Sequence, residues 1–145
     1  MEVAIRRLEP GDEARAAEAS ALFKSAAASL ARATSFLADS RNYIVVAEAG
    51  DELAGFLIAY RLARLDREAD QLFVYEIEVV PAFRRRRIGT KLMQWVRRTV
   101  DEERLMEAFV LTDSGNPAAI GLYGSTGAHV EADTGILFVY PGHAA

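Results

Sequence analysis

The fold is decided by residues 71–100, which read QLFVYEIEVVPAFRRRRIGTKLMQWVRRTV. The first ten residues are almost all strand-forming, and Pro81 ends the run because proline cannot donate to a β-ladder. From Ile88 onward, apolar residues recur at helical spacing with charged residues opposite them. The stretch therefore predicts a strand over residues 71–80, a basic turn over residues 84–90 and an amphipathic helix that begins at Ile88.

The residues before this stretch predict a short strand, two helices and a β-hairpin. Residues 3–8 read as a strand, and the alanine-rich residues 12–39 read as two helices, with Asp12 as the cap of the first and a break at residues 25–29. Residues 43–49 and 53–60 are rich in β-branched and aromatic residues and flank the turn pair Gly50-Asp51, so they predict a hairpin. Residues 61–70 are polar and predict a surface connector.

The residues after the stretch continue the alternation of strands and helices. Residues 109–112 predict a strand, residues 116–125 a short helix and residues 135–140 a last strand. This order predicts a mixed α/β fold, in which ligands gather beyond the carboxyl ends of the strands. We therefore expect a ligand at the turn that follows Val80.

Length and composition exclude several classes of protein. The 145 residues, 51% of them hydrophobic and 26% charged, predict one globular domain over residues 1–145. The absence of cysteine excludes disulfides and thiol catalysis, and two histidines are too few for a histidine metal cluster, so we predict no metal. The net charge of -4 argues against nucleic-acid binding, and the sequence shows neither a secretory signal nor an apolar run of membrane-spanning length. We expect a cytoplasmic protein with no nucleic-acid or membrane partner.

The basic turn is a candidate anion site. The first turn of a helix leaves N–H groups unpaired and carries a partial positive charge, both of which favour a bound diphosphate. A solvated arginine cluster or a nonspecific nucleic-acid patch is the alternative explanation. The position of the run directly between a strand and a helix, with Gly89 permitting close backbone approach, favours the phosphate site. Its residues are Arg84, Arg85, Arg86, Arg87, Ile88, Gly89 and Thr90.

Two carboxylates on the predicted central strand are candidates for acid–base chemistry. Glu76 and Glu78 are two residues apart and point to one face of the strand, whereas Tyr75, Ile77 and Val79 point to the other. The face is either the solvated side of a sheet or the lining of a cleft for a cationic amine. We prefer the cleft, with Glu76 as the base that takes a proton from the amine and Glu78 as the second candidate.

The turn resembles the cofactor motif of the GNAT superfamily of N-acetyltransferases, which runs Arg or Gln, two residues, Gly, one residue, Gly or Ala. Arg84 and Gly89 match this motif, and Arg87 replaces its first glycine. We expect the turn to stay right-handed at Arg87, with this side chain facing solvent or the ribose phosphate of the cofactor. A second match is NPAAIGLY over residues 116–123. The resemblance implies an α/β fold with a mixed, mostly antiparallel sheet of six to seven strands flanked by about four helices, and acetyl-CoA as co-substrate.

The resemblance also implies roles for individual residues. Tyr123 is expected to act as the general acid toward the departing thiolate, although a half-buried aromatic is the plainer reading. Asn116 is expected to cap a helix that starts at Pro117, to contact the cofactor, or to do both. The backbone amides of Ile77 and Val79 are expected to pair with the pantetheine arm. The expected cofactor contacts are therefore the basic turn together with Ile77, Glu78, Val79, Asn116, Ala119 and Tyr123.

Within the superfamily, the sequence is most similar to the small aminoglycoside 3-N-acetyltransferases of the gentamicin-resistance type. This similarity implies a small-molecule amine acceptor, such as an aminoglycoside acetylated at its 3-N position, and a possible homodimer. A polyamine or a peptide or protein amine fits an acidic cleft equally well. A CoA-binding module without activity is a further alternative, against which the presence of both Glu76 and Tyr123 argues. The candidate acceptor-binding residues are Glu76, Glu78, Asp113, Glu131 and Asp133.

Overall fold

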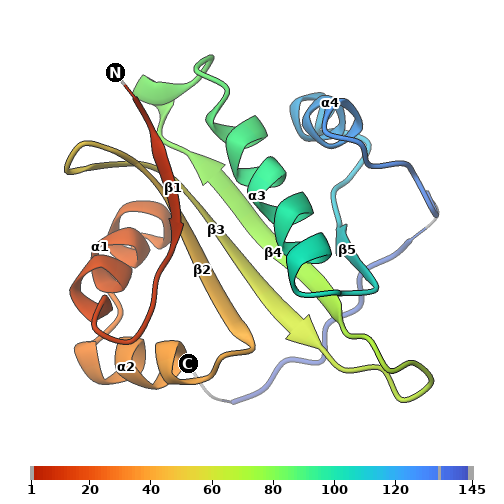
Figure 1. The fold of residues 1–145 in the computed structure, drawn as a ribbon, viewed down its shortest axis with the longest axis horizontal. Helices are drawn as coiled ribbons and strands as arrows, with labels where there is room; N and C mark the ends of the chain where they lie inside the picture. The colour runs from red at the N-terminus through yellow and green to blue at the C-terminus, as the bar shows by residue number, and fades with distance from the viewer. Residues whose placement is uncertain (1, 134, 144–145) are drawn as a thin grey trace.

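The computed structural model describes residues 2–133 and 135–143 of the chain (Figure 1). Among them, five strands form one sheet in the order β1-β2-β3-β4-β5, in which all neighbours are antiparallel except β4 and β5. The elements are β1 (Ala4–Arg7), α1 (Glu13–Lys24), α2 (Leu30–Ala38), β2 (Asn42–Ala49), β3 (Glu52–Leu62), β4 (Gln71–Val79), the 3-10 turn η1 (Pro81–Phe83), α3 (Ile88–Glu102), β5 (Glu107–Val110) and α4 (Pro117–Ser125).

This architecture confirms the predicted α/β class with four helices and a mostly antiparallel sheet. The sheet has five strands among the described residues instead of the expected six to seven. The expected last strand over residues 135–140 is wrong, because within residues 2–133 and 135–143 this segment pairs with no strand and its apolar side chains face solvent. No helix among the described residues is both long and apolar enough to cross a bilayer.

Two hydrophobic cores lie on opposite faces of the sheet. One joins α3 to the sheet and contains Leu57, Leu72, Val74 and Leu92. The other joins α1 and α2 to alternate residues of the same strands, including Ile44, Val46 and Phe56. Figure 1 shows α1 and α2 grouped beside β1 and β2, while α3 lies along β3 and β4. The helices therefore leave one face of β4 and β5 without a helix over it.

The helix starts differ in part from those expected. The break at residues 25–29 is confirmed, and Ser29 caps α2 by accepting from the Arg32 N–H at 3.0 Å. Asp12 precedes α1 but makes no side-chain cap, because its carboxylate instead accepts from the Glu9 N–H and pairs with Arg6. The β1 edge is thereby tied to the start of α1.

Strands β4 and β5 pair over only part of their length. Their parallel register runs from Gln71–Glu107 to Val74–Val110, where β5 ends. β4 continues to Val79 with β3 on one edge and no strand partner on the other edge among the described residues. The C-terminal half of β4 therefore presents a free backbone edge beyond the end of β5.

A β-bulge lies in the middle of β4. The register with β3 shifts between Ile58, which pairs with Glu76, and Ala59, which pairs with Val74, so Tyr75 is the extra residue. The bulge turns Tyr75 to the same face as Glu76, where its ring packs against Tyr60. The expectation that Tyr75 points with Ile77 and Val79 is therefore wrong, because a single inserted residue shifts the alternation.

Candidate active site

The basic turn has an alternating backbone. Arg84 is extended (φ -64°, ψ 155°), whereas Arg85 (φ 66°) and Arg87 (φ 60°) are left-handed. The expectation of a right-handed Arg87 is wrong, and each non-glycine residue in this conformation costs about 1–2 kcal/mol. The turn must join η1 to α3, whose first residue, Ile88, is fixed in the core. Alternation of handedness curves successive amides around one concave site, an arrangement that binds anions.

The amides of this turn are available to a ligand. The Arg84 N–H donates to the Pro81 carbonyl at 3.2 Å, and the next bonded amide is that of Lys91, which donates to the Arg87 carbonyl at 3.0 Å. Among the described residues, the amides of residues 85–90 have no hydrogen-bond partner. All four arginine side chains are exposed around this helix start. Free amides, a helix N-terminus and guanidinium groups together fit a diphosphate.

Gly89 has a packing role that sequence reasoning did not assign. A Cβ at this position would lie 3.2 Å from the Leu122 Cδ2 atom of α4. The glycine therefore allows α4 to approach the first turn of α3. Thr90 follows in this turn and is partly buried.

The free edge of β4 offers two backbone donors. Val80 donates its N–H to the Ala54 carbonyl at 2.8 Å, toward β3. Because amide direction alternates along a strand, the N–H groups of Ile77 and Val79 point to the opposite edge, beyond the end of β5. This geometry is the one expected for donors to an extended pantetheine arm.

Helix α4 places Asn116, Ala119 and Tyr123. The Asn116 Oδ1 accepts from the Ala119 N–H at 3.1 Å, which confirms the capping role of Asn116. Tyr123 is half-buried against the α3 side of the core, and this burial raises the pKa of its phenol. The phenol therefore remains protonated at neutral pH and is able to donate a proton.

Glu76 already binds an ammonium group within the protein. Its Oε2 atom lies 2.7 Å from the Nζ atom of Lys24, at the end of α1, and its side chain is only 18% exposed. The hydrogen bond to Glu76 raises the pKa of Lys24. Glu78 lies on the same face and is exposed. Sequence reasoning missed Lys24, because 52 residues separate it from Glu76 and no local pattern signals the contact.

A row of aromatic side chains continues from Glu76 across the sheet. Ring centroids are separated by 6.2 Å for Phe36–Tyr60, 5.6 Å for Tyr60–Tyr75, 5.9 Å for Tyr75–Phe73 and 4.9 Å for the stacked Phe73–Phe109 pair. The Tyr75 side chain is 56% exposed. We call these five residues the aromatic row. The spacing of Phe73 and Tyr75 hinted at a shared face, but only the bulge places Glu76 beside them.

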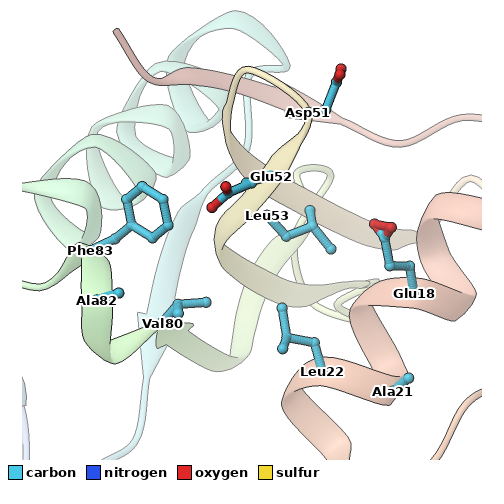
Figure 2. Close-up of a pocket in the computed structure, with 9 residues that line it drawn as sticks. All are labelled: Glu18, Ala21, Leu22, Asp51, Glu52, Leu53, Val80, Ala82 and Phe83. Carbon is cyan, nitrogen blue, oxygen red and sulfur yellow. The ribbon is translucent and has the colours of Figure 1, made fainter. Parts of the chain in front are cut away.

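A cavity of 680 Å³ opens between α1, the β2–β3 turn and the residues that lead into the basic turn (Figure 2). Its apolar wall includes Leu22, Leu53 and Phe83, and three carboxylates, Glu18, Asp51 and Glu52, lie around it. Leu53 belongs to the core beneath α1 and α2, so the cavity lies on the same face of the sheet as Glu76. Sequence reasoning did not predict this cavity, because its walls come from three separate segments.

The structure does not gather all of the expected acceptor residues. Asp113 lies in the β5–α4 loop, where it accepts from the Gly115 N–H at 2.7 Å. Glu131 pairs with His129 at 2.9 Å, and Asp133 is exposed. Within residues 2–133 and 135–143, none of the three is bonded to a residue of β4. No group of three or more potential metal ligands occurs in the same described part of the chain.

Comparison with known proteins places this geometry in one family. Residues 9–128 match the model of the acetyltransferase (GNAT) family. An aminoglycoside acetyltransferase from an uncultured soil metagenomic sample, solved with sisomicin, superposes with a TM-score of 0.83 at 22% identity over 97% of both chains. A ribosomal-protein-alanine N-acetyltransferase from Brucella melitensis superposes with a TM-score of 0.73 at 19% identity over 95% of this chain and 100% of that one. No curated protein sequence matches the chain.

Proposed function

Because the chain belongs to the acetyltransferase (GNAT) family and is an acetyl-CoA-dependent N-acetyltransferase, we propose that it acetylates a primary amine of a small cationic, ring-containing acceptor. An aminoglycoside, modified at its 3-N position, is the acceptor we favour. The observation that carries the proposal is the Glu76 carboxylate, which holds an ammonium at 2.7 Å beside the aromatic row. We also propose that residues 1–145 act as one catalytic domain.

Acetyl-CoA is the acetyl donor of this family, and the chain offers it a continuous binding surface. The free amides and arginines of the basic turn suit its diphosphate, and the N–H groups of Ile77 and Val79 suit the amides of its pantetheine arm. We propose that these residues, together with Glu78, Asn116, Ala119 and Tyr123, hold the co-substrate. Asn116 and Ala119 already bond to each other, so their contribution is to fix the start of α4.

The acid–base roles follow from the environments of two side chains. An ammonium must lose a proton before it attacks a thioester, and we propose that Glu76 accepts that proton directly or through water. The new N–C bond forms as the C–S bond breaks, and the Tyr123 phenol gives its proton to the departing sulfur. The acetylated nitrogen then loses its second proton, which restores the phenol directly or through water, and the proton held by Glu76 passes to solvent. The Tyr123 phenol carries this proton at neutral pH, because the pKa of a tyrosine is about 10 and burial raises it further here.

The surroundings of Glu76 favour a cyclic polycation over a flexible one. Aromatic faces pack against the apolar faces of sugar rings and attract cationic groups, and Tyr75 and Tyr60 lie next to Glu76 in the sheet. Glu78 and the three carboxylates around the cavity add negative charge on the same face. We propose that Asp113, Glu131 and Asp133 contribute only to this general field, because they are not bonded to β4 among the described residues.

The test is release of free thiol from acetyl-CoA with a panel of aminoglycosides, polyamines and peptides. We expect turnover with aminoglycosides, and Glu76→Gln is expected to lower kcat about 100-fold or more. Glu102→Gln is the control, because it removes an exposed carboxylate from the end of α3, on the other face of the sheet from Glu76, and is expected to keep kcat. Preference for a peptide would select the protein-amine alternative. Tight acetyl-CoA binding without thiol release for any acceptor would select the non-catalytic module.

A further inference from the structure

Lys24 is a primary amine of the chain itself that lies at the proposed catalytic base. Its Nζ atom is 2.7 Å from the Glu76 Oε2 atom, and within residues 2–133 and 135–143 it is the amine that pairs with this carboxylate. The Lys24 side chain is 44% exposed, so a ligand that enters from solvent can reach the amine. Lys24 therefore stands where the proposed function places the ammonium group of an acceptor.

The end of α1 is held in this position by packing against the sheet. Phe23, which precedes Lys24, stacks on Phe56 of β3 with ring centroids 4.4 Å apart. Ile58, two residues further along β3, faces the same side and pairs with Glu76 of β4. The backbone of Lys24 is thereby fixed over the β3–β4 pair, and only its flexible four-carbon stem has to move to bring the amine to a thioester.

A second lysine in the chain lacks these surroundings. Lys24 and Lys91 are the two lysines of the sequence. Lys91 belongs to α3, which packs on the face of the sheet opposite to that of Glu76, and it forms no ion pair with a carboxylate in the described part of the chain. The two amines therefore differ in whether a base lies within hydrogen-bond distance, and Lys91 serves as a comparison within the same molecule.

We propose that Lys24 is an internal acceptor, which the active site of the same chain acetylates when no other amine occupies Glu76. The inference rests on the proposed function, because it takes Glu76 as the base. Glu76 removes one proton from the ammonium group, the freed Nζ attacks the acetyl carbonyl of acetyl-CoA as the C–S bond breaks, and the Tyr123 phenol protonates the departing sulfur. The new amide nitrogen loses its second proton, which restores the phenol directly or through water, and the products are acetylated Lys24 and CoA.

The attachment of Lys24 to the chain favours this reaction. A nucleophile that is held beside its base reacts as if it were present at a very high concentration. An acceptor from solution must displace Lys24 from Glu76, so the two amines compete for one carboxylate. Acetylation removes the charge of Lys24 and with it the ion pair. The modified chain therefore leaves the Glu76 carboxylate to an external acceptor.

Mass spectrometry of the chain incubated with acetyl-CoA alone tests the proposal. The chain is first treated with a lysine deacetylase, which removes acetyl groups acquired before purification. We expect one acetyl group on Lys24, little on Lys91, and a rate per chain that does not change when the protein is diluted. Glu76→Gln is expected to slow acetylation of Lys24 about 100-fold. Lys24→Arg keeps a cation beside Glu76 and is expected to take up no acetyl group at this position.

Three results would overturn self-acetylation. Equal rates at Lys24 and Lys91, or a Lys24 rate that Glu76→Gln leaves unchanged, would mean that acetyl-CoA reacts with exposed amines without the active site. A rate per chain that rises with protein concentration would mean that one chain acetylates another. Circular dichroism of each variant shows whether it has folded, so a loss of acetylation is read only from folded protein.

The same samples separate this proposal from the proposed function. An aminoglycoside at saturating concentration is expected to slow acetylation of Lys24 while thiol release continues on the aminoglycoside. No acetyl group on Lys24, in a chain that acetylates aminoglycosides, would overturn self-acetylation and leave the proposed function in place. Acetylation of Lys24 that requires Glu76, in a chain that acetylates no external amine, would support self-acetylation and overturn the proposed acceptor.

Discussion

Tyr123 is half-buried in α4, and its hydroxyl has no protein hydrogen-bond partner among the described residues. The hydroxyl is therefore free to bond to a ligand. If it protonates the departing thiolate, Tyr123→Phe lowers kcat by about 10²-fold or more and leaves acetyl-CoA affinity nearly unchanged. Thiol release and calorimetry measure the two quantities. Tyr140→Phe is the control, since Tyr140 is exposed and remote from α4 in sequence. An unchanged kcat in Tyr123→Phe would assign the ring to packing alone.

The ammonium group of Lys24 is paired with the Glu76 carboxylate, to which we assign binding of the acceptor amine. A cationic acceptor must displace its ammonium from Glu76, so Lys24 opposes binding of the acceptor. Lys24→Met keeps the apolar stem and removes the charge, and we expect KM for a cationic acceptor to fall several-fold while kcat is kept. Arg98→Met removes an exposed charge from α3 and serves as the control. A higher KM in Lys24→Met would mean that the acceptor amine does not use Glu76.

The basic turn between η1 and α3 holds two arginines in a conformation that suits glycine. Arg87→Gly and Arg87→Ala remove the same charge, but only glycine relieves the left-handed backbone. We therefore expect the glycine variant to exceed the alanine variant by about 1 kcal/mol in free energy of unfolding, as measured by urea titration. Acetyl-CoA affinity is expected to fall equally in both. An alanine variant as stable as the glycine variant would show that the turn changes conformation when Arg87 is replaced.

The periodicity of the sequence predicted the elements that build the site, because the spacing of apolar residues within β4 and within α3 is enough to identify each one. The periodicity did not predict the face to which Tyr75 points. A bulge is one extra residue relative to the partner strand β3, so the sequence of β4 alone does not reveal it. The handedness of Arg87 was also beyond the pattern, because it follows from the fixed positions of the flanking η1 and α3. The strand expected over residues 135–140 was wrong, because strand propensity alone does not supply the neighbouring strand that a β-ladder requires.

Across the whole molecule, Glu48 ties three elements together. From β2, its carboxylate accepts from Arg6 of β1 at 2.6 Å and from Arg15 of α1 at 2.9 Å, and its side chain is only 14% exposed. The hydrogen bond to Arg6, followed by that to Arg15, holds the pKa of Glu48 below its usual value. The carboxylate therefore stabilises the fold while it is ionised, and it connects the N-terminal strand and helix to the sheet that carries Glu76.

The pH dependence of stability follows from this depressed pKa. The contribution of Glu48 is complete above the usual glutamate pKa, about 4.3, and is lost as pH falls through its lower value in the folded protein. We expect Glu48→Gln to lower the free energy of unfolding by about 1–3 kcal/mol at neutral pH and to converge with the unaltered chain in acid. Urea unfolding followed by fluorescence of the single tryptophan, Trp95, measures both limits. Glu52→Gln is the control, because Glu52 is an exposed carboxylate on β3 without an ion pair among the described residues, and it should change the free energy of unfolding little at either pH. If the difference in free energy of unfolding between Glu48→Gln and the unaltered chain were the same at all pH values, the charge of Glu48 would contribute nothing.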